Sequence, residues 1–254
     1  AWFGNCVMHY WGQPLVRGNV AFIPLVRDGV FRDRAPVVNV EGACATGSLA
    51  LNGAYKEIRA GDADVTIAVG VEKLYDAKNP AAILQEFGKG ADQLNPEEWI
   101  AHYTRIGEQL GQPFEMGADR SAAMDTYSMQ ARLHMNLYGT TREQIAAACA
   151  KSHTNGSLNP LAQYRFAMTP EQVLADLGGA VAGVNEGRFS IGGDIPVNPS
   201  GGVLCTNAIA VTAMIRVAEI ALQVSGRAGA HQVKGAKLGI ASGRSLPELM
   251  GERL

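Results

Sequence analysis

The stretch of sequence that decides the fold is PVVNVEGACATGSLALNGAYKEIRAGDADVTIAVGVE, residues 36–72. Residues 37–40 predict a short buried strand, and residues 44–60 predict a helix that Gly61 closes, because glycine readily adopts the left-handed conformation of a helix C-terminus. Alternating apolar side chains over residues 63–71 predict a second strand. Strand, sharp turn, helix and strand form a βαβ unit, which joins two parallel strands.

Outside this unit, regular and irregular stretches alternate. We expect an irregular covering region at about 73–118 and then a helix from about Asp119 to Gly139, with Met124, Ser128, Ala131 and Met135 on one face. Two further helices are predicted to begin at the caps Thr140–Glu143 and Thr169–Gln172. A helix over about 207–225 and a strand over 236–241 are predicted to follow. The alternation of strands and helices predicts a layered α/β fold.

The composition of the 254 residues excludes several classes of protein. With 47% apolar and 18% charged residues and no apolar run near the roughly 18 residues of a membrane helix, it indicates a globular protein. The net charge of −2 predicts no nucleic-acid or membrane partner. Area scaling predicts a folded surface of roughly 11,000 Å², with about 70% of the unfolded surface buried. The four cysteines lack the spacing of a disulfide scaffold or zinc site, so we expect reduced thiols in a cytoplasm.

Cys44 is the strongest candidate for a catalytic residue. It stands where the predicted strand turns into the predicted helix, so its sulfur meets the free N–H groups and the positive end of the helix dipole, which lower the pKa of a thiol. Bringing a thiol pKa of about 8.5 to neutrality takes about 2 kcal/mol, whereas a helix terminus supplies about 0.3–1 kcal/mol. We therefore expect a second donor or base nearby in space. The alternative is a small thiol packed at a helix start.

A second candidate is NPSGGVLCTN, residues 198–207, in which Gly201 and Gly202 precede a predicted helix. Backbone N–H groups at such a helix start can hold an anion or a developing oxyanion, although a plain glycine loop with Asn207 as N-cap is the alternative. The five histidines are scattered without metal-ligand spacing, and residues 42–48 lack the lysine of a phosphate loop. We therefore predict neither a metal site nor a nucleotide site.

Taken together, these residues resemble the thiolase superfamily, in particular its sterol-carrier-protein-type branch, also labelled acetyl-CoA acetyltransferases. The resemblance rests on residues 38–48 with Cys44, residues 119–165 with the pair Asn159-Pro160, residues 195–202 with the double glycine, and residues 228–233 with the strand expected after them. It implies an α/β fold of duplicated βαβαβ layers, an αβαβα sandwich that is incomplete in this chain.

The resemblance also implies a division into two halves. We expect an N-terminal half at 1–176, with the covering region at about 73–118 inserted in it, and a partial C-terminal half at 177–254. The first strand and helix of the first half, and the elements that open the second half, are expected to lie before Ala1 and at the Asp176–Leu177 junction of a longer chain. A degenerate short form is the alternative.

For the site, the resemblance implies that Cys44 accepts an acyl group from coenzyme A as a thioester. Asn207 matches the position of the family's histidine; an amide can donate a hydrogen bond to a thiolate or oxyanion but cannot take a proton. The family's closing cysteine would fall near Ser242-Gly243, where no cysteine stands. The implied site therefore comprises Cys44 and Asn207 as catalytic residues, with Gly201, Gly202, Ser242 and Gly243 positioning the oxyanion or substrate.

The implied activity is that of an acyl-CoA C-acyltransferase, with a coenzyme A thioester as substrate and no prosthetic group. The resemblance further implies an enzyme of lipid metabolism that forms a homodimer or a dimer of dimers; the cysteines, as above, predict a cytoplasmic location. Two alternatives stay open. One is a non-catalytic scaffold or acyl-CoA-binding subunit. The other is a retro-aldolase that uses tyrosines such as Tyr164 and pairs with a small OB-fold, zinc-ribbon subunit.

Overall fold

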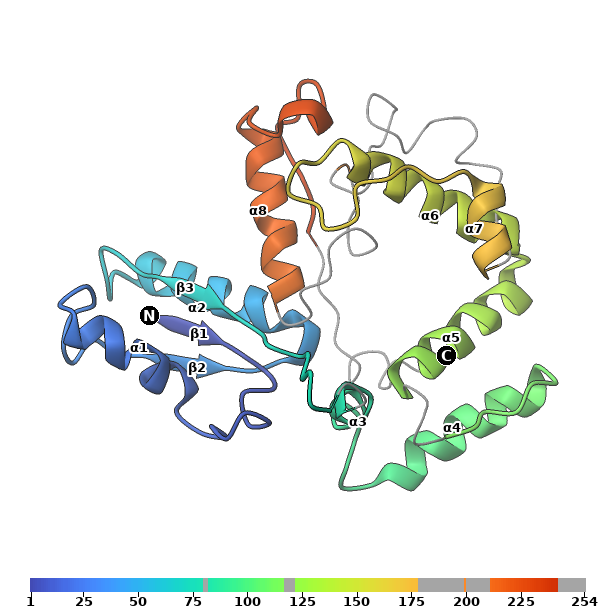
Figure 1. Cartoon of the computed structure of the whole chain (residues 1–254), viewed down its shortest axis with the longest axis horizontal. Helices are drawn as coiled ribbons and strands as arrows, with labels where there is room; N and C mark the ends of the chain where they lie inside the picture. Colours follow the sequence, from blue (N-terminus) through green and yellow to red (C-terminus); the bar gives the residue numbers. More distant parts are fainter. Residues whose placement is uncertain (80–81, 117–121, 178–198, 200–210, 242–254) are drawn as a thin grey trace.

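The computed structural model describes residues 1–79, 82–116, 122–177, 199 and 211–241 (Figure 1). The described elements, in chain order, are β1 (Trp2–Gly4), α1 (Arg17–Arg27), β2 (Val38–Val40), the 3₁₀ helix η1 (Ala43–Ala45), α2 (Thr46–Ala60), β3 (Ala68–Gly70), α3 (Ala82–Gly88), α4 (Pro96–Gln109), α5 (Ala122–Tyr138), α6 (Arg142–Ser157), α7 (Pro170–Leu177), α8 (Thr212–Val224) and the 3₁₀ helix η4 (Gly229–His231). A parallel sheet with packed helices confirms the predicted α/β class.

The described sheet is parallel, with strand order β2-β1-β3. Trp2 of β1 lies opposite Val38 on one side and Ala68 on the other. The strand predicted over 63–71 pairs only at Ala68–Gly70, because β1 offers three residues for pairing. β1 and α1 precede the βαβ unit in the chain. A strand of three residues is too short to show an alternating pattern.

Helices α1 and α2 cover opposite faces of the sheet. Neighbouring side chains of a strand point to opposite faces, and Phe3 meets α1 while Trp2 meets α2. A Cβ atom added to Gly18 of α1 would lie 2.5 Å from the Cβ of Phe3, and one added to Gly53 of α2 would lie 2.2 Å from the Trp2 ring. Both helices therefore approach β1 so closely that these two positions require glycine.

The predicted irregular region at about 73–118 contains two helices, α3 and α4, so that prediction is wrong. Helix α4 begins with Pro96 after Asn95. The negative charges of Glu97 and Glu98 in its first turn interact favourably with the positive end of the helix dipole. Its apolar side chains form the core of this part of the molecule. The buried members of that core are Ala91, Trp99, Tyr103, Ile106, Ala122 and Met129.

Helices α5, α6 and α7 follow one another at the predicted places, with shifted details. Gly139 ends α5 with a φ of 68°, as predicted. The capping box of α6 is formed by Thr141 and Gln144, one residue later than predicted. The face of α5 predicted to carry Met124, Ser128, Ala131 and Met135 is turned away from the core, since Met124 is 57% exposed whereas Met129 is buried.

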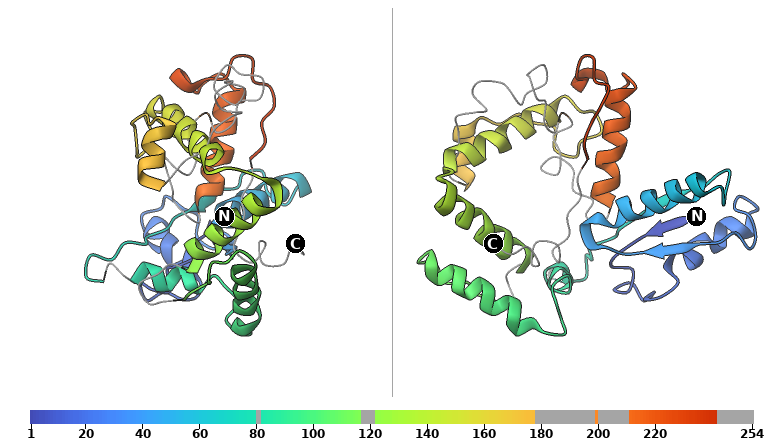
Figure 2. Two further views of the ribbon diagram at one scale, coloured as in Figure 1. Left: turned by 90° about the vertical axis from the view of Figure 1, so that its right-hand side faces the viewer. Right: turned by 180° about the vertical axis from the view of Figure 1, so that it is seen from behind.

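Helix α8 packs against α2 and η1, so it lies beside the point where the chain turns from β2 into α2 (Figure 2). The predicted helix start at 207 lies outside the described residues. The strand predicted over 236–241 is wrong, since these residues form no strand in the described structure and Leu238 and Ile240 are 86% and 89% exposed. A strand needs a neighbour with which to exchange hydrogen bonds, and no described strand lies there. Of the helices described, none combines the length and apolarity needed to cross a membrane.

Candidate active site at the carboxyl edge of the sheet

The three parallel strands end at the same edge of the sheet, and the residues that follow them form the candidate site (Figure 1). Cys6 follows β1, Cys44 follows β2 and Glu72 follows β3. Ligand sites of open parallel sheets lie outside the carboxyl ends of the strands. The predicted nucleophile therefore lies at the edge where this topology favours a site.

The backbone turns sharply just before Cys44. Ala43 has a φ of 46°, a left-handed conformation that costs a residue other than glycine roughly 1–3 kcal/mol. Cys44 lies in the 3₁₀ turn Ala43–Ala45, in which the N–H of Ala45 donates to the carbonyl of Gly42 at 2.9 Å. Backbone strain of this kind persists only where surrounding contacts hold it, and it collects at functional sites. The turn thus supports the interpretation of Cys44 as more than a packed thiol.

Cys44 is half-buried, and burial raises the pKa of its thiol above the ordinary value. The predicted acidification is therefore wrong in direction, because removal from water penalises the thiolate more than the helix start favours it. Two effects act against burial: a hydrogen bond from the Cys44 backbone and the positive charge of Arg216 on α8. Arg216 thus supplies a positive charge near the thiol. No sequence pattern could identify it, because α8 is far from Cys44 along the chain.

A second thiol, Cys6, lies against the same turn. Its Sγ is 3.1 Å from Thr46 Oγ1, 3.2 Å from the carbonyl oxygen of Ala43 and 3.5 Å from Glu41 Oε1. Burial, with smaller effects from the carboxylates of Glu72 and Glu41, raises the pKa of Cys6 to about 12. Cys6 therefore stays a neutral thiol at physiological pH and does not compete with Cys44 as a nucleophile.

The carboxylate of Glu72 fixes the chain that follows β1. It accepts hydrogen bonds from the backbone N–H of Cys6 at 2.8 Å, from that of Val7 at 3.0 Å and from Nδ2 of Asn5 at 2.9 Å. Asn5 Nδ2 also donates to the carbonyl of Val71 at 2.7 Å. These bonds join the ends of β1 and β3 and hold Cys6 beside the turn. Their partners are 65–67 residues apart, so no local pattern could reveal them.

The remaining predicted site residues lie outside the described part of the chain. They are Asn207, Gly201, Gly202, Ser242 and Gly243. Their roles beside Cys44 therefore stay predictions.

Two tyrosines bear on the alternative of a tyrosine acid or base. The ring of Tyr164 packs edge-on against Phe166, with a centroid distance of 6.2 Å. Tyr127 of α5 lies close enough to Cys44 that the charge of the thiolate adds to burial in raising the pKa of Tyr127. A tyrosine with a raised pKa can donate a hydrogen bond but does not ionise at neutral pH. Tyr127, which we did not predict, is therefore a tyrosine whose pKa responds to the charge of Cys44.

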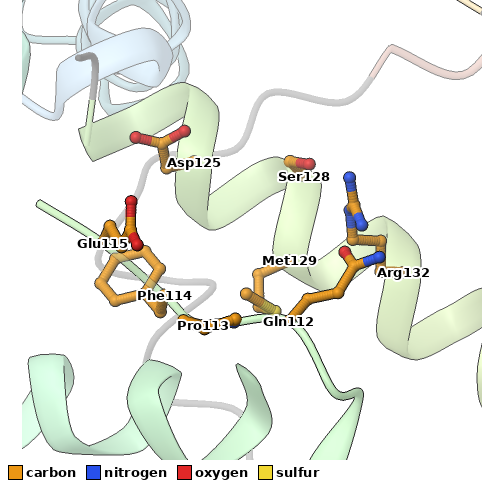
Figure 3. A pocket seen from close by; sticks show the side chains of 8 residues that line it. All are labelled: Gln112, Pro113, Phe114, Glu115, Asp125, Ser128, Met129 and Arg132. Atoms are coloured by element: carbon orange, nitrogen blue, oxygen red, sulfur yellow. The ribbon is translucent and has the colours of Figure 1, made fainter. Parts of the chain in front are cut away.

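A small groove opens between α5 and the chain that follows α4 (Figure 3). Asp125 and Arg132 line it from α5, and Glu115 lines it from the other side. Its volume of about 100 Å³ is well below the roughly 300–1,000 Å³ of ordinary small-molecule pockets. The groove is therefore no candidate for an acyl-CoA site. Within the described part of the chain, no three His, Cys, Asp or Glu side chains are grouped so that they could hold a metal ion.

Comparison with known proteins matches this chain to two family models. Residues 25–186 match the model described as "Thiolase, N-terminal domain". Residues 162–246 match the model described as "Thiolase C-terminal domain-like". The first match covers more than half of the chain and includes Cys44 with its turn. The second includes α8.

Three relatives illustrate the similarity. An acetyl-CoA acetyltransferase of Methanothermobacter thermautotrophicus is 37% identical over 150 residues, which are 59% of this chain and 33% of that protein. An acetyl-CoA acetyltransferase of Methanocaldococcus jannaschii is 34% identical over 139 residues, 55% of this chain and 30% of that protein. Sterol carrier protein 2 of Bos taurus is 30% identical over 139 residues, 55% of this chain and 23% of that protein. The matched part of the chain thus spans a third or less of each relative.

Proposed function

Because the chain belongs to the thiolase family, we propose that it is an acyl-CoA C-acyltransferase whose Cys44 carries the acyl group as a thioester. The observation that carries the proposal is the placement of Cys44 on a strained turn at the carboxyl edge of the sheet. Two relatives named acetyl-CoA acetyltransferase support the reaction class. The substrate is a coenzyme A thioester, and the proposed chemistry needs no prosthetic group.

The proposed reaction has two steps. First, Sγ of Cys44 attacks the carbonyl carbon of the acyl-CoA; the bond between that carbon and the sulfur of coenzyme A breaks, and coenzyme A leaves as a thiol with the proton that Cys44 gives up. Second, the α-carbon of another acyl-CoA loses a proton and attacks the carbonyl carbon of the Cys44 thioester. A carbon–carbon bond forms, the bond between that carbonyl carbon and Sγ of Cys44 breaks, and the proton lost by the α-carbon is balanced by the proton that the released Cys44 thiolate takes up. The reverse sequence cleaves the same bond.

The described residues support the first step in two ways. Arg216 favours the Cys44 thiolate through its positive charge. Cys6 is held as a neutral thiol, so the acyl group has one nucleophile at this edge rather than two. Asn207 and the Gly201-Gly202 pair are proposed donors to the oxyanion.

The test is direct detection of the acyl group. After incubation with acetyl-CoA, peptide mass spectrometry should find a hydroxylamine-sensitive acetyl thioester on Cys44. The matched pair of variants is Cys44→Ala, which should lose the adduct, and Cys6→Ala, which should keep it. Adducts found only on Cys6 or Cys149, or an unmodified Cys44 at saturating acetyl-CoA, would refute the covalent mechanism.

A non-catalytic acyl-CoA-binding subunit is the second candidate. It is favoured by the raised pKa of Cys44, since burial disfavours the thiolate that an acyl transfer needs. The same variant separates the two candidates. If acetyl-CoA binds equally well to the wild type and to Cys44→Ala, and neither protein releases free coenzyme A, the subunit is the better description.

A further inference from the structure

Thr46 is the most completely enclosed polar side chain at the candidate site, with 0% of its surface exposed. Its hydroxyl lies between the two peptide groups that form the turn before Cys44. Oγ1 accepts from the N–H of Gly42 at 2.9 Å and donates to the carbonyl of Ala43 at 2.7 Å. The single side chain therefore closes the turn on both sides of the left-handed Ala43.

The methyl group of Thr46 packs against the end of β1. A Cβ atom added to Gly4, the last residue of β1, would lie 2.9 Å from the Thr46 methyl carbon. The side chain is thus wedged between the end of β1 and the turn that follows β2.

Cys6 lies against the same hydroxyl. Its Sγ is 3.1 Å from Thr46 Oγ1, 3.2 Å from the carbonyl oxygen of Ala43 and 3.5 Å from Glu41 Oε1. The single thiol hydrogen of Cys6 serves one of these oxygens at a time, and either group can be the donor between Cys6 and Thr46. Cys6 therefore packs against the turn at the point where Thr46 closes it.

We propose that Thr46 is the positioning residue for Cys44, because its hydroxyl holds the left-handed turn that presents the Cys44 thiol at the carboxyl edge of the sheet. The proposal rests on the proposed function for the meaning of Cys44. Its own prediction concerns the geometry and reactivity of that thiol, and it can be tested without any acyl-CoA.

The test compares variants that separate the hydroxyl from the shape of the side chain. Thr46→Val keeps the branched shape but removes the hydroxyl that accepts from the N–H of Gly42 and donates to the carbonyl of Ala43. Thr46→Ser keeps the hydroxyl and removes the methyl. The matched control is Thr126→Val, because Thr126 is also buried and also donates to the carbonyl three residues earlier, at 2.9 Å, but in helix α5.

The readout is the rate of iodoacetamide labelling of Cys44 in the folded protein, followed by peptide mass spectrometry as a function of pH. In Thr46→Val we expect the labelling profile to move to higher pH and the rate at neutral pH to fall roughly tenfold, since misplaced reacting groups lose rates of that order or more. Thr46→Ser should recover the rate to within about threefold, and Thr126→Val should match the wild type. A purely structural role predicts the opposite, because partial unfolding speeds the labelling of Cys44, Cys6 and Cys149 together.

Wild-type or faster labelling of Cys44 in Thr46→Val would overturn the proposal. If circular dichroism shows that Thr46→Val does not fold, Thr46→Ala, which adds no apolar bulk, is measured in its place. If that variant also fails to fold, hydrogen exchange of the wild-type Gly42 amide decides: strong protection is expected, and free exchange overturns the proposal. Slower labelling in Thr46→Val together with no acyl adduct on wild-type Cys44 would refute the proposed function and leave the positioning role standing.

Discussion

At the residue scale, the chemistry of Cys44 depends on opposing influences on one sulfur atom. Burial raises its pKa, while its own backbone hydrogen bond and the charge of Arg216 lower it. The thiolate fraction at neutral pH is therefore sensitive to any change in the nearby charge. Cys6 differs because its nearest charged groups are carboxylates, which add to burial instead of opposing it.

Replacing Arg216 tests this balance. Arg216→Gln removes a positive charge that favours the thiolate, so the pKa of Cys44 should rise and its iodoacetamide labelling should need a higher pH. At neutral pH we expect labelling to slow roughly two- to tenfold, because the thiolate is the reactive form. Arg216→Lys keeps the charge and should retain most of the rate. An unchanged labelling rate in Arg216→Gln would show that the charge of Arg216 does not affect the pKa of Cys44.

Only part of the site could be predicted at this scale. Cys44 was recognisable because a thiol between a strand and a helix is a local pattern in the sequence. Thr46, two residues on, gave no signal of its own, since its role depends on the close approach of Gly4 and Cys6. Glu72 depends in the same way on the meeting of strands that are far apart in sequence. Burial, which makes the pKa shift of Cys44 upward instead of downward, also cannot be recognised in the local sequence.

At the element scale, an ionic cluster joins α3 to the chain that follows β1. Glu86 of α3 lies 2.7 Å from Nε2 of His9 and also pairs with Lys89. Nδ1 of His9 lies 3.2 Å from the carbonyl of Cys6. Both ring nitrogens of His9 thus face acceptor oxygens, one on the side chain of Glu86 and one on the backbone of Cys6. The cluster connects α3 to the backbone of Cys6 and hence to the candidate site.

The pH dependence of stability tests this connection. Burial would raise the pKa of Glu86, but hydrogen bonds from Lys89 and His9 outweigh burial and hold it below the ordinary 4.5. A lowered folded-state pKa stabilises the protein above the unfolded-state pKa, and this stabilisation is lost as pH falls through the folded-state value. Glu86→Gln should therefore lower the free energy of unfolding by about 1 kcal/mol at pH 7 and by less at pH 4.

Urea denaturation at the two pH values measures the effect. Glu108→Gln is the matched control, because Glu108 is an exposed glutamate on the neighbouring helix α4. Equal losses for Glu86→Gln at both pH values would contradict an ionised, hydrogen-bonded Glu86.

The helices differ in how far local sequence predicts them. The signals of α4 were present, since Asn95-Pro96 begins a helix and Trp99, Tyr103 and Ile106 recur at helical spacing. We missed this helix because glycines and polar residues around it dominated the pattern. The length of β3, in contrast, could not be predicted, because β1 limits the pairing to three residues.

At the scale of the whole molecule, the chain exposes more surface than its size predicts. Its accessible surface is 15535 Å², whereas a compact chain of this mass exposes roughly 11,000 Å². Against roughly 39,000 Å² for the unfolded chain, about 60% of the surface is buried instead of the predicted 70%. Part of the exposed surface is apolar, and its most exposed large side chains are Leu94, Ile240 and Leu238, at 98%, 89% and 86%.

This exposure leads to a prediction about association. Two large apolar side chains that leave water contribute about 1.5–3 kcal/mol each, and a net charge of −2 provides little repulsion between copies. We therefore expect the chain to self-associate with increasing concentration, in line with the predicted homodimer, when measured by size-exclusion chromatography with light scattering. The double variant Leu238→Lys/Ile240→Lys should shift the protein toward the monomer. Leu94→Lys is the matched control, because Leu94 is 98% exposed but lies between α3 and α4.

If both variants weaken association equally, general solubility and not the segment at 236–241 controls association. A wild-type chain that stays monomeric at high concentration would mean that these side chains are solvated without a partner.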